Sequence, residues 1–296
     1  MIDRRSVLAG IALLPPMASA ALAQGSSLRT AAIPGAGAVP VVGVGTANAA
    51  FNAPSPALKE SLARFAALGG SVIDTAPSYG NAEETLGQLI AELGIRNRLF
   101  LATKVGVDSK AEGLAQIEQS FKRLRTDRID LIAVHNLRDV DNQLAILRDL
   151  KARRRIRAYG ITTSADRQYE EFEAVMRRQA MDTIQVDYAL DNRNAAQRIL
   201  PLAQDKGCAV FVNLPFGRSR LFDKTAGKPL PDWARDFGAA SWAQFFLKYV
   251  LSHPARPIAI PGMSKVAHVA DNVAAARGPL PDAKMRLRME QLIDAL

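Results

Sequence analysis

The fold is decided by Ser71-Val72-Ile73-Asp74 and by two later apolar stretches that also end in a reactive side chain, Leu99-Phe100-Leu101-Ala102-Thr103-Lys104 and Ile129-Asp130-Leu131-Ile132-Ala133-Val134-His135. Tyr79 follows Asp74 by five residues, in the loop after the first stretch. In a parallel barrel, the C-terminal ends of successive strands converge on one mouth. The sequence therefore predicts one pocket that holds a carboxylate, a phenol, an ammonium and an imidazole.

Strand-like and helix-like segments alternate over most of the chain. The eight strand candidates are 41–45, 71–74, 99–103, 129–134, 156–161, 182–187, 209–213 and 257–260. The segments between them carry apolar residues at helical spacing, as in Leu114, Ile117, Phe121 and Leu124. A hairpin over 28–39 turns at Pro34-Gly35. This alternation predicts an α/β fold, a single (β/α)8 TIM barrel with an N-terminal β-hairpin over its floor.

Two segments near the C-terminus, 242–250 and 214–236, have compositions that predict a packed helix and a mobile loop. One helical face carries Trp242, Phe245, Phe246, Tyr249 and Val250. We interpret it as packing against the barrel and not as a ligand site. The segment 214–236 contains three prolines and mixed charges, and we expect it to be the most mobile loop.

Composition limits the possible partners. A chain of 296 residues with 48% hydrophobic residues suits one soluble barrel, and no apolar run is long enough to span a bilayer in the mature protein. Cys208 is the single cysteine, which excludes an intramolecular disulfide and a cysteine cluster, and we predict a small buried side chain there and no metal site. The net charge is +9, but we interpret the basic run 151–157 as a solvated helix end. We expect a monomer that does not bind nucleic acid.

Residues 1–23 resemble a twin-arginine (Tat) export signal. Arg4 and Arg5 precede a mild apolar stretch, and Ala21-Leu22-Ala23 fits the small-residue rule for signal peptidase. This predicts a Tat-type signal peptide over 1–23, a barrel domain over 24–296, and export of the folded protein by the Tat machinery to the periplasm. The alternative is a disordered or helical N-terminal extension.

Eight short motifs, in order, resemble those of the aldo-keto reductases over residues 28–296. They are Gly45-Thr46, Asp74-Thr75-Ala76-x-x-Tyr79-Gly80-x-x-Glu83-x-x-Leu86-Gly87, Thr103-Lys104, Asp130-Leu131-x-x-x-His135, Gly160-Ile161-Thr162, Gln185-Val186-Asp187-Tyr188, Pro215-Phe216-Gly217 and Ile260-Pro261-Gly262, the last running on to Asp271-Asn272. The resemblance implies an enzyme that reduces small aldehydes or ketones to alcohols by hydride transfer from NADP(H) or NAD(H).

The resemblance also implies a role for each of the four clustered residues. Tyr79 would donate the proton, and His135 would orient the carbonyl. A free phenol has a pKa near ~10 and is a weak acid, but a nearby cation favours its ionised form. Lys104 would supply that cation, and Asp74 would hold it charged and in place.

No glycine-rich dinucleotide fingerprint follows a strand, which excludes a Rossmann site. The family instead lays its cofactor across the barrel mouth. The residues that match its contacts are Gly45, Thr46, Asp74, Thr162, Thr163, Gln185, Asn213, Leu214, Pro215, Phe216, Gly217, Gly262, Met263, Ser264, Lys265, His268, Asp271 and Asn272.

Three cofactor positions depart from the family pattern. Thr162-Thr163 replaces the usual Ser-Asn, and Asn213 stands where a tyrosine commonly stacks on the nicotinamide. His268 stands where an arginine often clamps the 2′-phosphate, and an imidazole cannot form that bidentate contact. Preference for NADP over NAD then depends on Ser264 and Lys265 beside a helix N-terminus.

Two other functions compete with this interpretation. A Schiff-base lyase on the same barrel would use Lys104 as its nucleophile. A catalytically silent nucleotide-binding or sensor protein would keep the fold without turnover, and the altered cofactor positions favour it. The complete set of four reactive residues argues for the reductase.

Overall fold

Eight parallel strands form the central sheet of the computed structural model, which describes residues 27–296. The strands are β3 (Val44–Gly45), β4 (Val72–Asp74), β5 (Phe100–Val105), β6 (Ile129–His135), β7 (Ile156–Thr162), β8 (Thr183–Asp187), β9 (Ala209–Asn213) and β10 (Ile258–Ala259). They are apolar almost throughout because helices cover the outer face and the barrel interior covers the inner face. All eight predicted strands are confirmed.

The strands follow one another in chain order around the sheet, from β3 to β10. Parallel bridges join Val42 to Ala259 and Gly45 to Gly262, and the amide of Gly43 donates to the carbonyl of Ala259 at 2.8 Å. These contacts bring the first and last strands together. The arrangement matches the predicted (β/α)8 fold.

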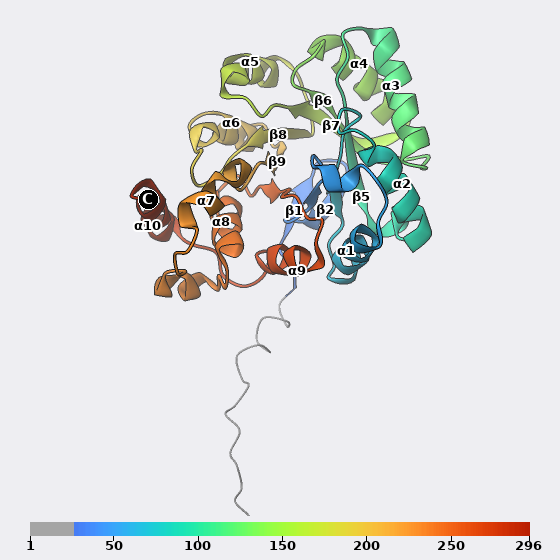
Figure 1. Cartoon of the computed structure of the whole chain (residues 1–296). Helices are drawn as coiled ribbons and strands as arrows, with labels where there is room; N and C mark the ends of the chain where they lie inside the picture. The colour runs from blue at the N-terminus through green and yellow to red at the C-terminus, as the bar shows by residue number, and fades with distance from the viewer. Residues whose placement is uncertain (1–26) are drawn as a thin grey trace, which may run out of the picture.

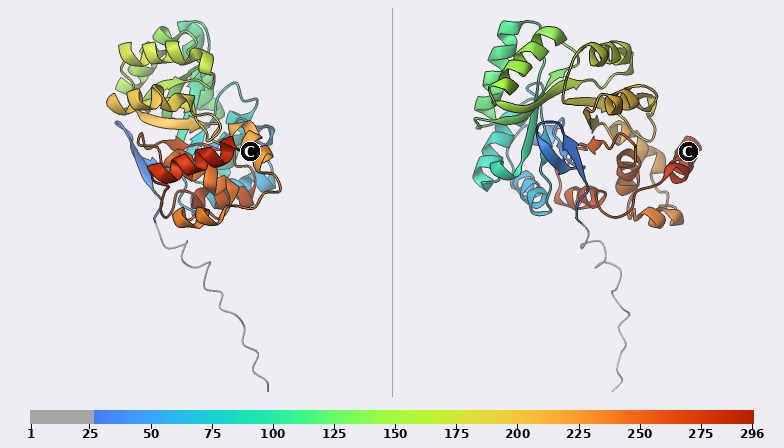
Figure 2. Two further views of the ribbon diagram at one scale, coloured as in Figure 1. Left: turned by 90° about the vertical axis from the view of Figure 1, so that its left-hand side faces the viewer. Right: turned by 180° about the vertical axis from the view of Figure 1, so that it is seen from behind.

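The predicted N-terminal hairpin is also confirmed. Strands β1 (Thr30–Ile33) and β2 (Gly37–Pro40) pair in an antiparallel two-stranded sheet. The guanidinium of Arg157, near the start of β7, donates to the carbonyl of Ala36 in the hairpin turn. The hairpin therefore lies over the end of the barrel where the strands begin, as the view from behind shows (Figure 2).

Helices surround the strands (Figure 1). They are α1 (Pro56–Ala67), α2 (Ala82–Leu93), α3 (Lys110–Arg123), α4 (Val140–Ala152), α5 (Tyr169–Arg178), α6 (Ile199–Asp205), α7 (Arg220–Thr225), α8 (Trp242–Leu251), α9 (Val266–Ala274) and α10 (Ala283–Asp294). Several of these helices begin with a serine N-cap, whose hydroxyl accepts a hydrogen bond from a backbone amide of the first turn. The hydroxyl of Ser55 accepts from the amide of Leu58, and that of Ser241 accepts from the amide of Gln244.

The buried face of α3 differs from the predicted one. Leu114 is 45% exposed, whereas Ile117 and Phe121 are buried as expected. The cause is Gly113, where a Cβ atom would lie 2.1 Å from Oε1 of Gln143 on α4. The glycine lets α3 and α4 approach closely, and that contact turns Leu114 toward solvent.

The segment 214–236 contains more regular structure than the sequence suggests. It holds α7 and two 3-10 helices, η5 (Gly217–Ser219) and η6 (Asp232–Phe237). Trp233 packs against the core, and its ring centroid lies 5.5 Å from that of Phe245 on α8. Aromatic packing of this kind fixes the second half of the segment.

The basic run 151–157 is more than a solvated helix end. Lys151 pairs with Asp182 at 2.5 Å, and Arg157 pairs with Asp130 at 3.3 Å. Both carboxylates are buried, so two of the cations in the run neutralise charge inside the protein. Cys208 is buried as predicted, and burial raises the pKa of its thiol.

The predicted signal peptide, residues 1–23, lies outside the described residues. Within 27–296, no helix is both long and apolar enough to cross a membrane. Across the same range, no group of three or more His, Cys, Asp or Glu side chains is placed to hold a metal ion.

Candidate active site

The four reactive residues meet at the C-terminal mouth of the barrel. Asp74 ends β4, Lys104 lies in β5, His135 ends β6, and Tyr79 lies in the loop after β4. Nζ of Lys104 lies 2.7 Å from Oδ2 of Asp74 and donates to the carbonyl of Thr75 at 2.8 Å. Lys104 is 1% exposed and Asp74 is 5% exposed. The strand ends thus form a buried ion pair below the mouth.

Lys104 carries a positive charge in this environment. Burial alone would lower the pKa of Lys104, but the Asp74 carboxylate and the Tyr79 hydroxyl raise it above its ordinary value. An amine must lose its proton before it attacks a carbonyl. The ion pair therefore argues against Lys104 as a Schiff-base nucleophile.

The tyrosine and the histidine lie next to this ion pair. Nζ of Lys104 is 5.0 Å from the ring centroid of Tyr79. The rings of Tyr79 and His135 meet edge to face, with centroids 5.9 Å apart and an interplanar angle of 84°. Burial, followed by the charges of Lys104 and Arg138, lowers the pKa of His135 to about 4. The imidazole is therefore neutral near pH 7 and carries a single N–H.

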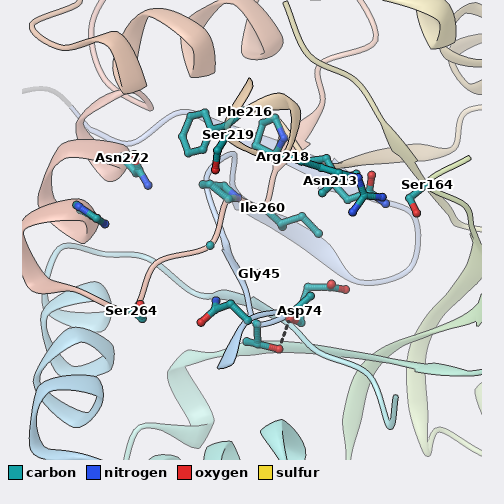
Figure 3. Close-up of a pocket in the computed structure, with 18 of the residues that line it drawn as sticks. Gly45, Asp74, Ser164, Asn213, Phe216, Arg218, Ser219, Ile260, Ser264 and Asn272 are labelled. Atoms are coloured by element: carbon teal, nitrogen blue, oxygen red, sulfur yellow. Dashed lines mark hydrogen bonds between the residues drawn. The ribbon is translucent and has the colours of Figure 1, made fainter. Parts of the chain in front are cut away.

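A cavity of about 1010 Å³ opens over these residues. The predicted site residues that line it are Gly45, Thr46, Asp74, Tyr79, His135, Thr162, Thr163, Gln185, Asn213, Leu214, Pro215, Phe216, Gly262, Ser264, His268, Asp271 and Asn272. Figure 3 shows Gly45 and Asp74 on one side, with Phe216, Arg218 and Ser219 facing them. The structure thus brings together most of the predicted residues, while their roles stay predictions.

Four predicted residues do not line the cavity. Lys104 is buried against Asp74. Gly217 is buried with φ +58°, and a Cβ atom there would lie 2.4 Å from Oδ1 of Asp191, so the loop turn requires a glycine. Met263 is 1% exposed and packs in the core. Lys265 is exposed at the start of α9.

Twelve further residues line the cavity that sequence reasoning did not place there. They are Ala47, Asn48, Asn136, Ser164, Arg218, Ser219, Phe222, Ser241, Trp242, Ala243, Ile260 and Pro261. Several of them lie just after a strand end, as Asn136 does after β6. This position in the sequence could have indicated that they line the mouth of the barrel. The helical stripe of α8 packs as predicted, with Phe245, Phe246, Tyr249 and Val250 buried, but Trp242 at its start also lines the cavity. This tryptophan is the first residue of α8, faces the cavity, and donates from Nε1 to the carbonyl of Lys228 at 3.0 Å.

Two amide side chains, Gln185 in β8 and Asn213 at the end of β9, organise the deep part of the cavity. Nε2 of Gln185 donates to Oδ2 of Asp74 at 3.3 Å. Nδ2 of Asn213 donates to the carbonyl of Thr163 at 3.1 Å. Oδ1 of Asn213 is buried and has no partner among the described residues. A buried acceptor without a donor is costly, which fits a wall built to meet a polar ligand.

The opposite end of the cavity lies at α9. The carboxylate of Asp271 accepts from the Ser241 hydroxyl at 2.8 Å and from Nε2 of Gln244 at 2.7 Å. Asp271 is therefore fixed by its own neighbours. Ser264 and His268 line the cavity beside the first turn of α9, where the helix dipole favours an anion. The cavity thus has a polar deep end and an anion-compatible outer end.

Comparison with known proteins places this architecture in a family. Residues 41–293 match the Aldo/keto reductase family. The chain belongs to that family.

Relatives with reductase names cover different shares of the chain. Aldo-keto reductase YhdN of Bacillus subtilis is 35% identical over 152 residues, which are 46% of this chain and 45% of that protein. Methylglyoxal reductase DkgB of Yersinia pestis is 27% identical over 262 residues, or 84% of this chain and 91% of that protein. A crystal structure of an aldo/keto reductase from Klebsiella pneumoniae, in complex with NADP and acetate, has 26% identity and a TM-score of 0.74 over 90% of this chain and 96% of that chain.

Proposed function

We propose that the protein is an NADP(H)-dependent oxidoreductase, with NAD(H) as a second cofactor, that reduces small aldehydes or ketones to alcohols. The buried Lys104–Asp74 pair beside Tyr79 carries this proposal, because it places a fixed cation next to a phenol at the mouth of a large cavity. Membership of the family supports the reaction class. The relative named for methylglyoxal reduction supports a small carbonyl as substrate.

Each side chain has one task in this reaction. The Tyr79 hydroxyl donates its proton to the carbonyl oxygen, and the Lys104 ammonium stabilises the phenolate that results. Asp74 and the carbonyl of Thr75 hold that ammonium in place. In the oxidative direction the phenolate of Tyr79 takes the proton back from the alcohol.

The cavity suits a nicotinamide dinucleotide, which supplies the hydride when bound. Oδ1 of Asn213, which has no partner within residues 27–296, and the amide of Gln185 lie at the deep end, where a carboxamide would find polar groups. Ser264 and His268 stand at the outer end, beside a helix N-terminus that favours phosphate. The Klebsiella relative was crystallised with NADP, which supports the same cofactor here.

The proposal is tested by mixing the purified protein with NADPH and a panel of small aldehydes and ketones that includes methylglyoxal. We expect substrate-dependent oxidation of NADPH, read from its absorbance. Tight NADPH binding without turnover on any member of the panel would favour the silent binding protein. A carbonyl compound trapped on Lys104 by borohydride would favour the lyase.

Lys265 is predicted to select the phosphorylated cofactor. It is exposed at the start of α9, close in sequence to Ser264 of the cavity wall, and its flexible side chain can reach a 2′-phosphate. Lys265→Ala should raise the Kd for NADPH about tenfold, the usual scale of a charge-assisted hydrogen bond, and leave that for NADH unchanged. Fluorescence titration measures both constants.

The control for this experiment is Lys284→Ala, which removes an exposed lysine from α10. It should change neither constant. Equal losses for NADPH and NADH in Lys265→Ala would contradict the assignment.

We also propose that residues 1–23 direct export of the folded protein through the Tat pathway to the periplasm. Arg4→Lys combined with Arg5→Lys should leave the chain uncleaved in the cytoplasm, while the natural sequence should be exported and begin near Gln24. Cell fractionation with N-terminal sequencing measures both. Arg153→Lys with Arg154→Lys, an exposed pair in the barrel, is the matched control and should be exported. A natural chain that keeps Met1 in the cytoplasm would remove the export proposal only.

A further inference from the structure

The imidazole of His135 has one hydrogen-bond contact among the described residues. The hydroxyl oxygen of Ser78 lies 3.4 Å from Nδ1 of His135. Ser78 is exposed and, over the same residues, has no other side-chain hydrogen bond. It lies between Asp74 and Tyr79 in the loop after β4, so one short loop supplies both the proposed proton donor and this contact.

The position of the imidazole ring is set by its other neighbours. The edge-to-face contact with Tyr79 fixes one side of the ring. On the backbone side, a Cβ atom at Gly106 would lie 3.0 Å from Cβ of His135, so this glycine leaves room for the histidine. The hydroxyl of Ser78 is then the group that can distinguish the two ring nitrogens.

A neutral imidazole holds its proton on either Nδ1 or Nε2, and the choice decides what it can do to a carbonyl. If Nδ1 carries the proton, Nε2 is an acceptor and repels a carbonyl oxygen. If Ser78 donates to Nδ1, the proton lies on Nε2, which can donate to that oxygen. The second arrangement lets both hydrogen bonds form at once.

We propose that Ser78 is a positioning residue, whose hydroxyl donates to Nδ1 of His135 and holds the imidazole in the Nε2–H tautomer. Its effect on turnover rests on the proposed function, because it matters only if His135 must donate to a substrate carbonyl. The tautomer itself does not depend on that function. The two statements can therefore be tested separately.

His253 provides a reference for the tautomer inside the same molecule. Its Nδ1 accepts from the amide of Ala255 at 3.1 Å. A backbone amide can only donate, which fixes the proton of neutral His253 on Nε2. Burial, followed by the charge of Arg286, lowers the pKa of His253 to about 4, so both imidazoles are neutral near pH 7. The chain contains three histidines, so their signals are separable.

The tautomer is read from long-range proton–nitrogen NMR spectra of histidine-labelled protein at neutral pH. The signals of His135 are those that vanish in His135→Gln. We expect the natural protein to show the same Nε2–H pattern for His135 and His253. Ser78→Ala should shift His135 toward the Nδ1–H form and leave His253 unchanged, and Ser78→Thr should keep the original pattern. An Nδ1–H pattern for His135 in the natural protein, or an identical pattern in Ser78→Ala, would overturn the proposal.

Turnover gives the second readout. Ser78→Ala should lower kcat for carbonyl reduction about fivefold, the scale of one lost hydrogen bond, without changing the Kd for NADPH. Ser78→Thr should restore kcat. An unchanged kcat in Ser78→Ala would overturn the positioning role even if the tautomer shifts. If the natural protein reduces no carbonyl, the proposed function fails, and the NMR comparison still decides the tautomer.

Discussion

Tyr79→Phe is expected to lower kcat for carbonyl reduction by about 10²- to 10⁴-fold, the range that general acid catalysis supplies. The substitution removes one oxygen atom and keeps the ring, so its edge-to-face contact with His135 should remain. The Kd for NADPH should stay nearly constant, because the hydroxyl acts only in the chemical step. Steady-state kinetics and fluorescence titration of the same preparation measure the two effects.

The matched control is Tyr159→Phe. Tyr159 lies in β7, is buried, and donates its hydroxyl hydrogen to the carbonyl of Ala180 at 3.1 Å. It does not line the cavity, so the loss of its oxygen should leave kcat unchanged. Near-normal turnover in Tyr79→Phe would show that another group supplies the proton.

Lys104→Met is expected to lower the free energy of unfolding by about 3–5 kcal/mol, the usual effect of breaking a buried ion pair, and to abolish carbonyl reduction. Methionine has a similar length and carries no charge. The loss comes from Asp74, whose side chain stays buried and keeps, among residues 27–296, one side-chain donor, Nε2 of Gln185 at 3.3 Å. Urea denaturation measures the stability, and NADPH oxidation measures the activity.

The double variant Asp74→Asn with Lys104→Met separates the two effects. It removes both charges, so most of the lost stability should return, because no unpaired charge stays buried. Activity should not return, because the phenolate of Tyr79 would still lack a cation. A double variant that is as unstable as Lys104→Met would show that the ion pair contributes through packing instead of charge.

The strand ends were the most predictable part of the molecule. A parallel strand covered on both faces has a nearly continuous apolar sequence, so a polar residue marks its end. This signal located Asp74, Lys104 and His135 and predicted that they would meet. It depends only on the barrel topology, which carries the C-terminal ends of neighbouring strands to one mouth.

Helix faces and loop conformations were less predictable. The period of α3 indicates a buried Leu114, but the close approach at Gly113 is a contact between two helices that one segment cannot reveal. The cavity wall at Arg218 and Ser219 depends on left-handed backbone, with φ +54° and +77°. Neither residue type favours that conformation, so the sequence carries no sign of it.

The meeting of β3 and β10 gives the barrel a thermodynamic link to its ligand. Each of these strands has only two residues, so few backbone hydrogen bonds hold the seam. The cavity wall includes Gly45 on one side of the seam and Gly262 on the other. A nucleotide that contacts both glycines should stabilise their pairing by mass action, by about 2.7 kcal/mol at one hundred times Kd. Cofactor binding and the pairing of the last strand with the first should therefore be coupled, so that each stabilises the other.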